Sequence, residues 1–109
     1  MSMSNRSVIV TGAAGNLGKA VVDAFADLGA NLVAVDLGRA RLGRALGSEN
    51  ERRAFVAANL LEASGAAEVA RSAIGRFGRI DVLCNIAGGF RMGEMVDETS
   101  HDNWNFLFD

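Results

Sequence analysis

The sequence predicts an α/β fold in which a doubly wound parallel sheet carries helices on both faces. Three observations predict it: short apolar strands alternate with helical segments, a glycine-rich stretch separates the first strand from the first helix, and an aspartate ends the second strand. Such alternation is typical of parallel strands that are joined by helical crossovers. We expect four strands in the order 3-2-1-4.

The first half of the sequence contains two mainly apolar strands with a helix between them. Ser7–Thr11 and Asn31–Asp36 have the continuous pattern of strands that are buried on both faces. Asn16–Leu28 is predicted to be a helix because apolar residues recur there at helical spacing. These residues are Leu17, Val21, Phe25 and Leu28. Gly29 lies where a left-handed residue would end this helix.

The second half of the sequence continues the alternation less regularly. Gly38–Gly47 is predicted to be a loose helix or a loop, and Ala54–Ala57 is a weak third strand. A helix is expected over about Ser64–Phe77, with Ser64 as its cap. Ile80–Cys84 is the fourth predicted strand. A further short helix is predicted from Thr99 onward.

The glycine-rich stretch Thr11–Gly18 reads T-G-A-A-G-N-L-G. Gly12 would supply the positive φ that a sharp turn from strand to helix requires. Gly15 and the short Asn16 would let the backbone approach a pyrophosphate, and Gly18 would let the helix pack closely on the sheet. N–H groups at the helix start, together with the helix dipole, would bind the anion. Glycines also make ordinary tight turns, but a stretch between a strand and a helix favours a Rossmann-type dinucleotide site.

Asp36 lies 18 residues after Gly18, close to the expected spacing of about 20. Its carboxylate could accept hydrogen bonds from both hydroxyls of an adenosine ribose and would repel a 2′-phosphate, which favours NAD over NADP. NADP enzymes place a basic side chain near the ribose, whereas Leu37 follows Asp36 here. Arg39 and Arg41 are near enough in sequence to keep NADP open. A plainer interpretation is that Asp36 only caps the following turn.

Together these segments resemble the short-chain dehydrogenase/reductase family. The matching pieces are T-G-A-A-G-N-L-G at Thr11–Gly18, Asp36, Asn59–Leu60, and N-I-A-G at Asn85–Gly88. The stretch R-F-G-R-I-D-V-L-C-N-I-A-G-G is especially similar to the family's fourth-strand signature. The resemblance covers essentially the whole chain.

The resemblance implies a role for each matching position. The residues that would wrap the pyrophosphate and the adenosine ribose are Gly12, Gly15, Asn16, Leu17 and Gly18. Asp36 would bind that ribose, while Asn59 and Leu60 would flank the adenine. The residues that would stabilise the central sheet and border the cofactor's riboses are Asn85, Ala87 and Gly88.

Among the matching positions that depart from the family's usual pattern are Asn16 and Asn59, and also Ile86, for which little consequence is expected. Asn16 stands where the commonest branch has glycine, and the turn is expected to survive because asparagine tolerates positive φ better than most residues. Asn59 stands where aspartate is more usual, so it would contact adenine without a charge.

The resemblance also implies a catalytic tyrosine, a lysine four residues later, a serine and an asparagine, all beyond the glycine-rich half. The sequence contains no tyrosine, and its one lysine, Lys19, lies in the predicted cofactor helix. No catalytic residue is therefore assigned. We expect residues 1–109 to be the N-terminal part of a Rossmann domain whose catalytic part is absent. The family's sheet would continue past Ile80–Cys84, so the unpaired edge of that strand is expected to favour self-association, as in a homo-oligomer.

Composition and charge argue against several other classes of function. The formal net charge is −2 and no basic block is present, so nucleic acid is not an expected partner. The apolar runs are too short to span a bilayer. The single cysteine, Cys84, cannot form an internal disulfide, which favours the cytoplasm, and it is expected to act as a buried apolar residue. His101 is expected to be solvated, and no metal-ligand spacing is present.

The leading hypothesis is an NAD-dependent oxidoreductase that moves hydride between the nicotinamide and a carbonyl or secondary alcohol of a small-molecule substrate. A second hypothesis is a dinucleotide-binding module without catalytic activity. A third is a relative of the nucleotide-sugar epimerases, because the glycine spacing also suits that branch.

Overall fold

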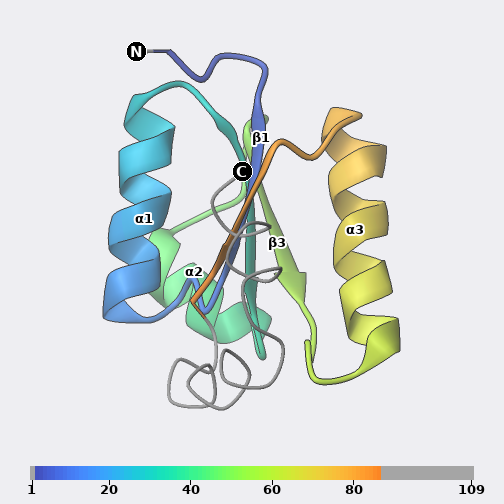
Figure 1. Ribbon diagram of the computed structural model, residues 1–109. Coiled ribbons are helices and arrows are strands. Elements are labelled where there is room, and N and C mark those ends of the chain that lie inside the picture. Colours follow the sequence, from blue (N-terminus) through green and yellow to red (C-terminus); the bar gives the residue numbers. More distant parts are fainter. Residues whose placement is uncertain (1, 87–109) are drawn as a thin grey trace, which may run out of the picture.

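The computed structural model describes residues 2–86. Strands and helices alternate along this part of the chain (Figure 1), as β1 (Ser7–Thr11), α1 (Asn16–Asp27), β2 (Asn31–Asp36), α2 (Arg39–Leu46), β3 (Arg53–Ala57), α3 (Ala63–Phe77) and β4 (Val82–Asn85). All neighbouring strands are parallel, and their order is β3-β2-β1-β4. The predicted fold class and strand order are confirmed. The helix predicted from Thr99 lies outside the described residues.

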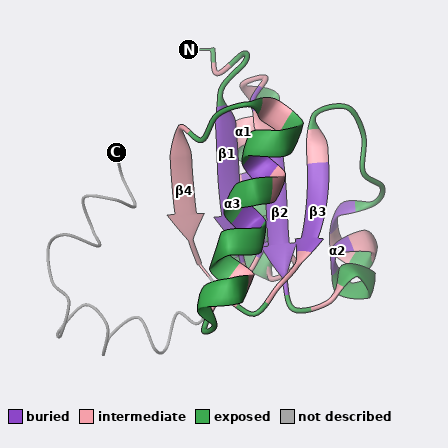
Figure 2. Cartoon of the chain, turned by 90° about the vertical axis from the view of Figure 1, so that its right-hand side faces the viewer, coloured by how far each residue is buried: buried purple, intermediate pink, exposed green. Residues whose placement is uncertain are grey.

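The sheet separates two apolar cores. Helices α1 and α2 cover one face and α3 covers the other (Figure 1). Neighbouring residues of one strand point to opposite faces, so Val8 and Val10 pack under α1 and α2 while Ile9 packs with α3. Every residue of β1 is buried, whereas β4 is half-buried along its length (Figure 2). The central strands therefore fix the position of whatever follows their carboxyl ends.

Helix α1 packs its predicted apolar stripe against the core at Val21 and Phe25, but not at Leu17. Gly18 and Val22 are its buried residues, and Leu17 is 65% exposed, so the apolar stripe assigned through Leu17 was wrong at its first position. The reason is that α1 approaches the turn before it through Gly18, which directs Leu17 away from the sheet. The expected end of the helix is confirmed, because Gly29 has the left-handed φ of +87°.

Two other boundaries differ from the sequence-based prediction. The residue that caps α3 is Glu62, and no side chain makes a cap hydrogen bond, so the assignment of Ser64 as the cap was wrong. Strand β4 begins at Val82 rather than Ile80, because the preceding Asp81 bonds through its carboxylate to the Ser7 N–H and to Arg79. Residues 38–47, predicted as a helix or a loop, contain the helix α2.

The helices within residues 2–86 do not have the length and apolar character that crossing a lipid bilayer requires.

Candidate functional site

The carboxyl end of β1 leads into a tight turn, Gly12–Gly15, here called the glycine turn. Gly12 has a left-handed φ of +66°, which a side chain would disfavour, so the role predicted for it is confirmed. The Gly15 N–H donates to the Gly12 carbonyl at 3.1 Å, and the Ala13 N–H donates to the Val35 carbonyl of β2 at 3.0 Å. Asn16 is the first residue of α1 and does not need a positive φ. The glycine turn is therefore fixed to both central strands.

Gly18 lets the first turn of α1 lie directly against the glycine turn. A Cβ atom built on Gly18 would be 2.0 Å from the Gly12 carbonyl oxygen and 2.8 Å from the Ala13 Cα. Backbone atoms cannot yield as a flexible side chain can, so only glycine allows this contact. The predicted close approach is present, although it is made to the glycine turn rather than to the strands.

The start of α1 presents backbone N–H groups without a side-chain cap. The first helical bond runs from the Lys19 N–H to the Gly15 carbonyl, so the N–H groups of Asn16, Leu17 and Gly18 precede the intrahelical ladder. The capping residue, Gly15, has no side chain to offer, and the first turn contains no acidic residue. Together with the helix dipole, this arrangement suits an anion such as a phosphate.

Asp36 connects the end of β2 to the glycine turn. Its side chain is largely buried, and its Oδ2 accepts a hydrogen bond from the Ala14 N–H at 3.1 Å. Its Oδ1 accepts from the Leu37 N–H at 2.8 Å, which is the turn-capping role. The Arg41 guanidinium lies 3.5 Å from Oδ1. Asp36 therefore caps its own turn and also places a carboxylate beside the glycine turn.

The end of β4 forms the other side of this corner. Thr11 and Asn85 are register partners in β1 and β4, and the Thr11 hydroxyl donates to Asn85 Oδ1 at 2.7 Å. The Ile86 N–H in turn donates to Thr11 Oγ1 at 2.9 Å. Thr11 was quoted in the glycine-rich motif but was given no role. A polar residue that ends a buried strand was the available signal for it.

Asn59 and Leu60 lie in the turn between β3 and α3, residues 58–62, here called the Asn59 turn. This turn starts beside β2, because the Ala58 N–H donates to the Asp36 carbonyl at 3.0 Å. Asn59 is exposed, and its Oδ1 accepts from the Leu61 N–H at 3.0 Å. Leu60 packs partly against the core under α3. The predicted positions up to Asn85 thus lie together at the carboxyl ends of the strands. Ala87 and Gly88 lie outside the described residues.

Other reactive side chains do not form a second cluster in the described part of the chain. Cys84 is half-buried in β4, and burial raises the pKa of its thiol, which disfavours the thiolate. Within residues 2–86, no three of the side chains that commonly bind metals are grouped to hold an ion. His101 lies outside the described residues.

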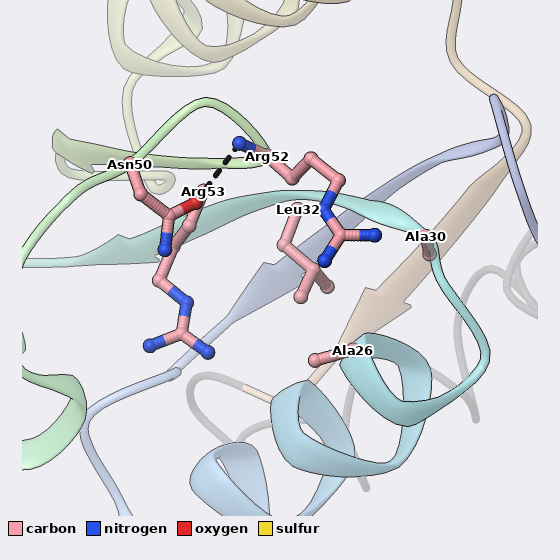
Figure 3. A pocket seen from close by; sticks show the side chains of 6 residues that line it. All are labelled: Ala26, Ala30, Leu32, Asn50, Arg52 and Arg53. Carbon is pink, nitrogen blue, oxygen red and sulfur yellow. Dashed lines mark hydrogen bonds between the residues drawn. The ribbon is translucent and has the colours of Figure 1, made fainter.

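A small cavity opens at the opposite end of the sheet, near the starts of β2 and β3 (Figure 3). Its volume is about 50 Å³, and Leu32, Arg52 and Arg53 are among its lining residues. Ligand pockets for small molecules are several times larger. This cavity is therefore not the dinucleotide site that the sequence predicts.

The parallel sheet, the glycine turn and the aspartate at the end of β2 define a Rossmann-type α/β protein. Residues 6–109 match the family described as short chain dehydrogenase, and the chain belongs to that family.

Relatives with known names or structures support this membership. The D-threitol dehydrogenase of Mycolicibacterium smegmatis is 33% identical over an alignment of 106 positions, and the match covers 94% of this chain and 40% of that protein. A short-chain dehydrogenase of the glucose/ribitol type from Brucella melitensis is 38% identical, with a TM-score of 0.69 over 74% of this chain and 35% of that chain. The 3-ketoacyl-(acyl-carrier-protein) reductase of Brucella melitensis, solved with NADH, is 28% identical, with a TM-score of 0.70 over 76% of this chain and 34% of that chain.

The chain spans 40% of the length of the D-threitol dehydrogenase and less of the multifunctional peroxisomal enzymes that it also matches. Its resemblance to them covers the N-terminal half of the family's fold. The family is one of oxidoreductases that use nicotinamide dinucleotides.

Proposed function

We propose that this chain is the cofactor-binding part of a short-chain dehydrogenase/reductase that prefers NAD to NADP. The observation that carries the proposal is the Ala14–Asp36 hydrogen bond, which places a buried carboxylate beside the uncapped start of α1. The helix start would hold the pyrophosphate, and Asp36 would accept hydrogen bonds from the hydroxyls of the neighbouring ribose. Bound NAD would supply the hydride acceptor for the oxidation of an alcohol.

The donor set suits this group on chemical grounds. Backbone N–H groups and a helix dipole are complementary to phosphate, and a carboxylate accepts from ribose hydroxyls. A 2′-phosphate would meet the same carboxylate at short range and be repelled. Arg41, beside Asp36, offsets part of that repulsion, so we expect a preference for NAD rather than a complete exclusion of NADP.

The remaining predicted positions complete the proposed site. Gly12, Gly15, Asn16, Leu17 and Gly18 would surround the pyrophosphate. Asn59 and Leu60 would flank the adenine, and Asn85, Ala87 and Gly88 would border the riboses.

We propose that the substrate of the complete enzyme is a small carbonyl compound or secondary alcohol, and that the enzyme acts in the cytoplasm as a homo-oligomer. These 109 residues contain no tyrosine, so the family's catalytic tyrosine and lysine pair is not among them. We therefore expect this chain alone to bind NAD without turning over an alcohol. The family match and the dehydrogenase relatives favour an oxidoreductase over an epimerase relative or a non-catalytic module.

Titration calorimetry of this chain with NAD and with NADP tests the proposal. We expect NAD to bind roughly tenfold more tightly, a difference of about 1.4 kcal/mol. Asp36→Ala should narrow that gap, whereas Asp23→Ala, which removes an exposed charge from α1, should leave it unchanged. Equal affinities in the unmodified chain would refute the preference. Failure to bind either dinucleotide would contradict the proposed function of this chain.

A further inference from the structure

Strand β3 is the outer strand of the sheet, and two side chains form hydrogen bonds with its backbone at Phe55. The Phe55 N–H donates to Glu49 Oε2 at 3.0 Å, and the Phe55 carbonyl accepts from Arg39 Nη1 at 2.8 Å. The other Arg39 nitrogen, Nη2, pairs with Glu49 Oε1. Arg39, Glu49 and the Phe55 backbone therefore form one closed hydrogen-bond network, here called the Glu49 clamp.

The backbone of Arg39 lies close to the proposed ribose site. Arg39 is the first residue of α2 and follows Asp36 by three positions. Arg41, two residues further along the same helix, reaches Asp36 Oδ1 at 3.5 Å. The start of α2 is thus within the reach of an arginine side chain from the carboxylate, yet Arg39 is directed to the sheet edge instead.

An arginine near the ribose is the group that accommodates a 2′-phosphate in NADP-binding Rossmann domains. On the basis of the proposed function, we propose that Glu49 holds Arg39 away from the ribose site and so strengthens the preference for NAD. Glu49 is a positioning residue, because it acts through Arg39 and does not itself lie at the turn that binds the dinucleotide. Asp36 repels the additional phosphate, and Glu49 withholds a cation that would attract it.

The charges of the clamp support this role at neutral pH. The hydrogen bond from the Phe55 N–H, followed by the bond and the charge of Arg39, lowers the pKa of Glu49, so Glu49 is ionised. The Arg39 and Glu49 side chains are 57% and 35% exposed, so water weakens their attraction. A partly exposed ion pair of this kind shifts an equilibrium by roughly twofold to fivefold. The clamp therefore biases Arg39 without locking it.

The test compares the binding of two nucleotides to the full chain by titration calorimetry. The first is 5′-AMP, and the second is adenosine 2′,5′-bisphosphate, which carries the additional phosphate of NADP. In Glu49→Ala, we expect the affinity for the bisphosphate to rise roughly twofold to fivefold while that for 5′-AMP stays constant. Loss of structure alone would lower both affinities together. Glu49→Gln keeps an acceptor for the Phe55 N–H, and it should give a smaller rise in the same direction if the alanine variant does not fold.

Two controls separate the clamp from a general effect of charge. Adding Arg39→Ala to Glu49→Ala should return the ratio of the two affinities to that of the unmodified chain. Glu51→Ala removes the same charge from an exposed position two residues away and should leave the ratio unchanged.

An unchanged ratio in both Glu49 variants, with 5′-AMP still bound, overturns this inference alone. An equal rise in Glu51→Ala, or a rise that persists without Arg39, also overturns it. Failure of the unmodified chain to bind 5′-AMP instead overturns the proposed function and this inference with it.

Discussion

The glycine turn and the Asn59 turn are alike in how closely the following helix packs against them. Each joins a strand to a crossover helix, and each helix carries a glycine in its first turn that contacts the backbone of the preceding turn. A Cβ atom on Gly18 would lie 2.0 Å from the Gly12 carbonyl oxygen, and one on Gly65 would lie 2.1 Å from the Asn59 carbonyl oxygen.

The two turns differ in what their polar groups do. In the Asn59 turn the Asn59 side chain accepts a hydrogen bond from the Leu61 N–H at 3.0 Å, so the polar side chain is bonded within its own turn. In the glycine turn the polar side chain comes from another strand, because Asp36 of β2 accepts from the Ala14 N–H, while the helices after both turns begin without a side-chain cap. A glycine at the start of a helix therefore indicates close packing, and the carboxylate of Asp36, which comes from another strand, is what distinguishes the glycine turn as the proposed nucleotide site.

The largest expected effect is that of Gly18→Ala. The Gly12 carbonyl is bonded to the Gly15 N–H, and Ala13 is bonded to β2, so neither can move away from the new methyl group. We expect a loss of about 3 kcal/mol in the free energy of unfolding. NAD binding should be lost even at a temperature where the variant is folded, because the helix start must move. Chemical denaturation followed by calorimetry would measure both, and intact NAD binding would show that the turn is not the site.

Gly65→Ala should have a smaller effect, above all on NAD binding, because the Asn59 turn is more exposed and does not hold the proposed pyrophosphate. We expect a loss of about 1–2 kcal/mol in the free energy of unfolding, with NAD affinity reduced less than threefold. Gly75→Ala is the matched control in the same helix, since nothing lies within 4 Å of its Cβ position. That variant should gain about 0.5–1 kcal/mol. If Gly65→Ala abolished NAD binding as completely as Gly18→Ala, the functional distinction between the two turns would be wrong.

In each of the two strands that lead into these turns, one backbone N–H donates to a carboxylate. The Ser7 N–H of β1 donates to Asp81 Oδ2 at 2.8 Å, as the Phe55 N–H of β3 donates to Glu49. The Arg79 hydrogen bond, followed by that from Ser7, lowers the pKa of Asp81. The pKa of each carboxyl group is therefore lower in the folded chain than its ordinary value of about 4.

The smallest expected effect is the dependence of stability on pH that follows from this. A carboxylate with a lowered folded pKa stabilises the fold above its unfolded pKa, and that contribution is lost as the pH falls through the folded value. Asp81→Asn and Glu49→Gln should each cost about 1 kcal/mol or less at pH 7. Asp81→Asn should cost more, because Asp81 is 13% exposed and Glu49 is 35% exposed. Thermal unfolding from pH 7 to about pH 2 should show both differences shrinking below about pH 4, whereas constant differences would argue against the two ionised contacts.

The features that the sequence predicted correctly are local or periodic. Gly12 needed only the rule that a sharp turn after a strand requires positive φ, and the parallel sheet followed from alternating strands and helices. The Glu49 clamp was not predicted, because it depends on how α2 lies against β3, which residue spacing does not reveal. Ser64 was assigned as a cap on its residue type, whereas the turn before α3 is already closed by the Asn59 side chain. The extent of β4 depended on the contacts of Asp81 with β1.

The hydrogen bond between Thr11 and Asn85 has a consequence for protein synthesis, because it joins residues that are 74 positions apart. At an elongation rate of about 5–20 residues per second, a ribosome needs roughly 4 to 15 seconds to add the second partner after the first. The first strand, its turn and its helix therefore leave the ribosome well before the strand that completes their neighbourhood. The corner that Thr11, Asn85 and Ile86 form is therefore completed only after β4 has docked against β1.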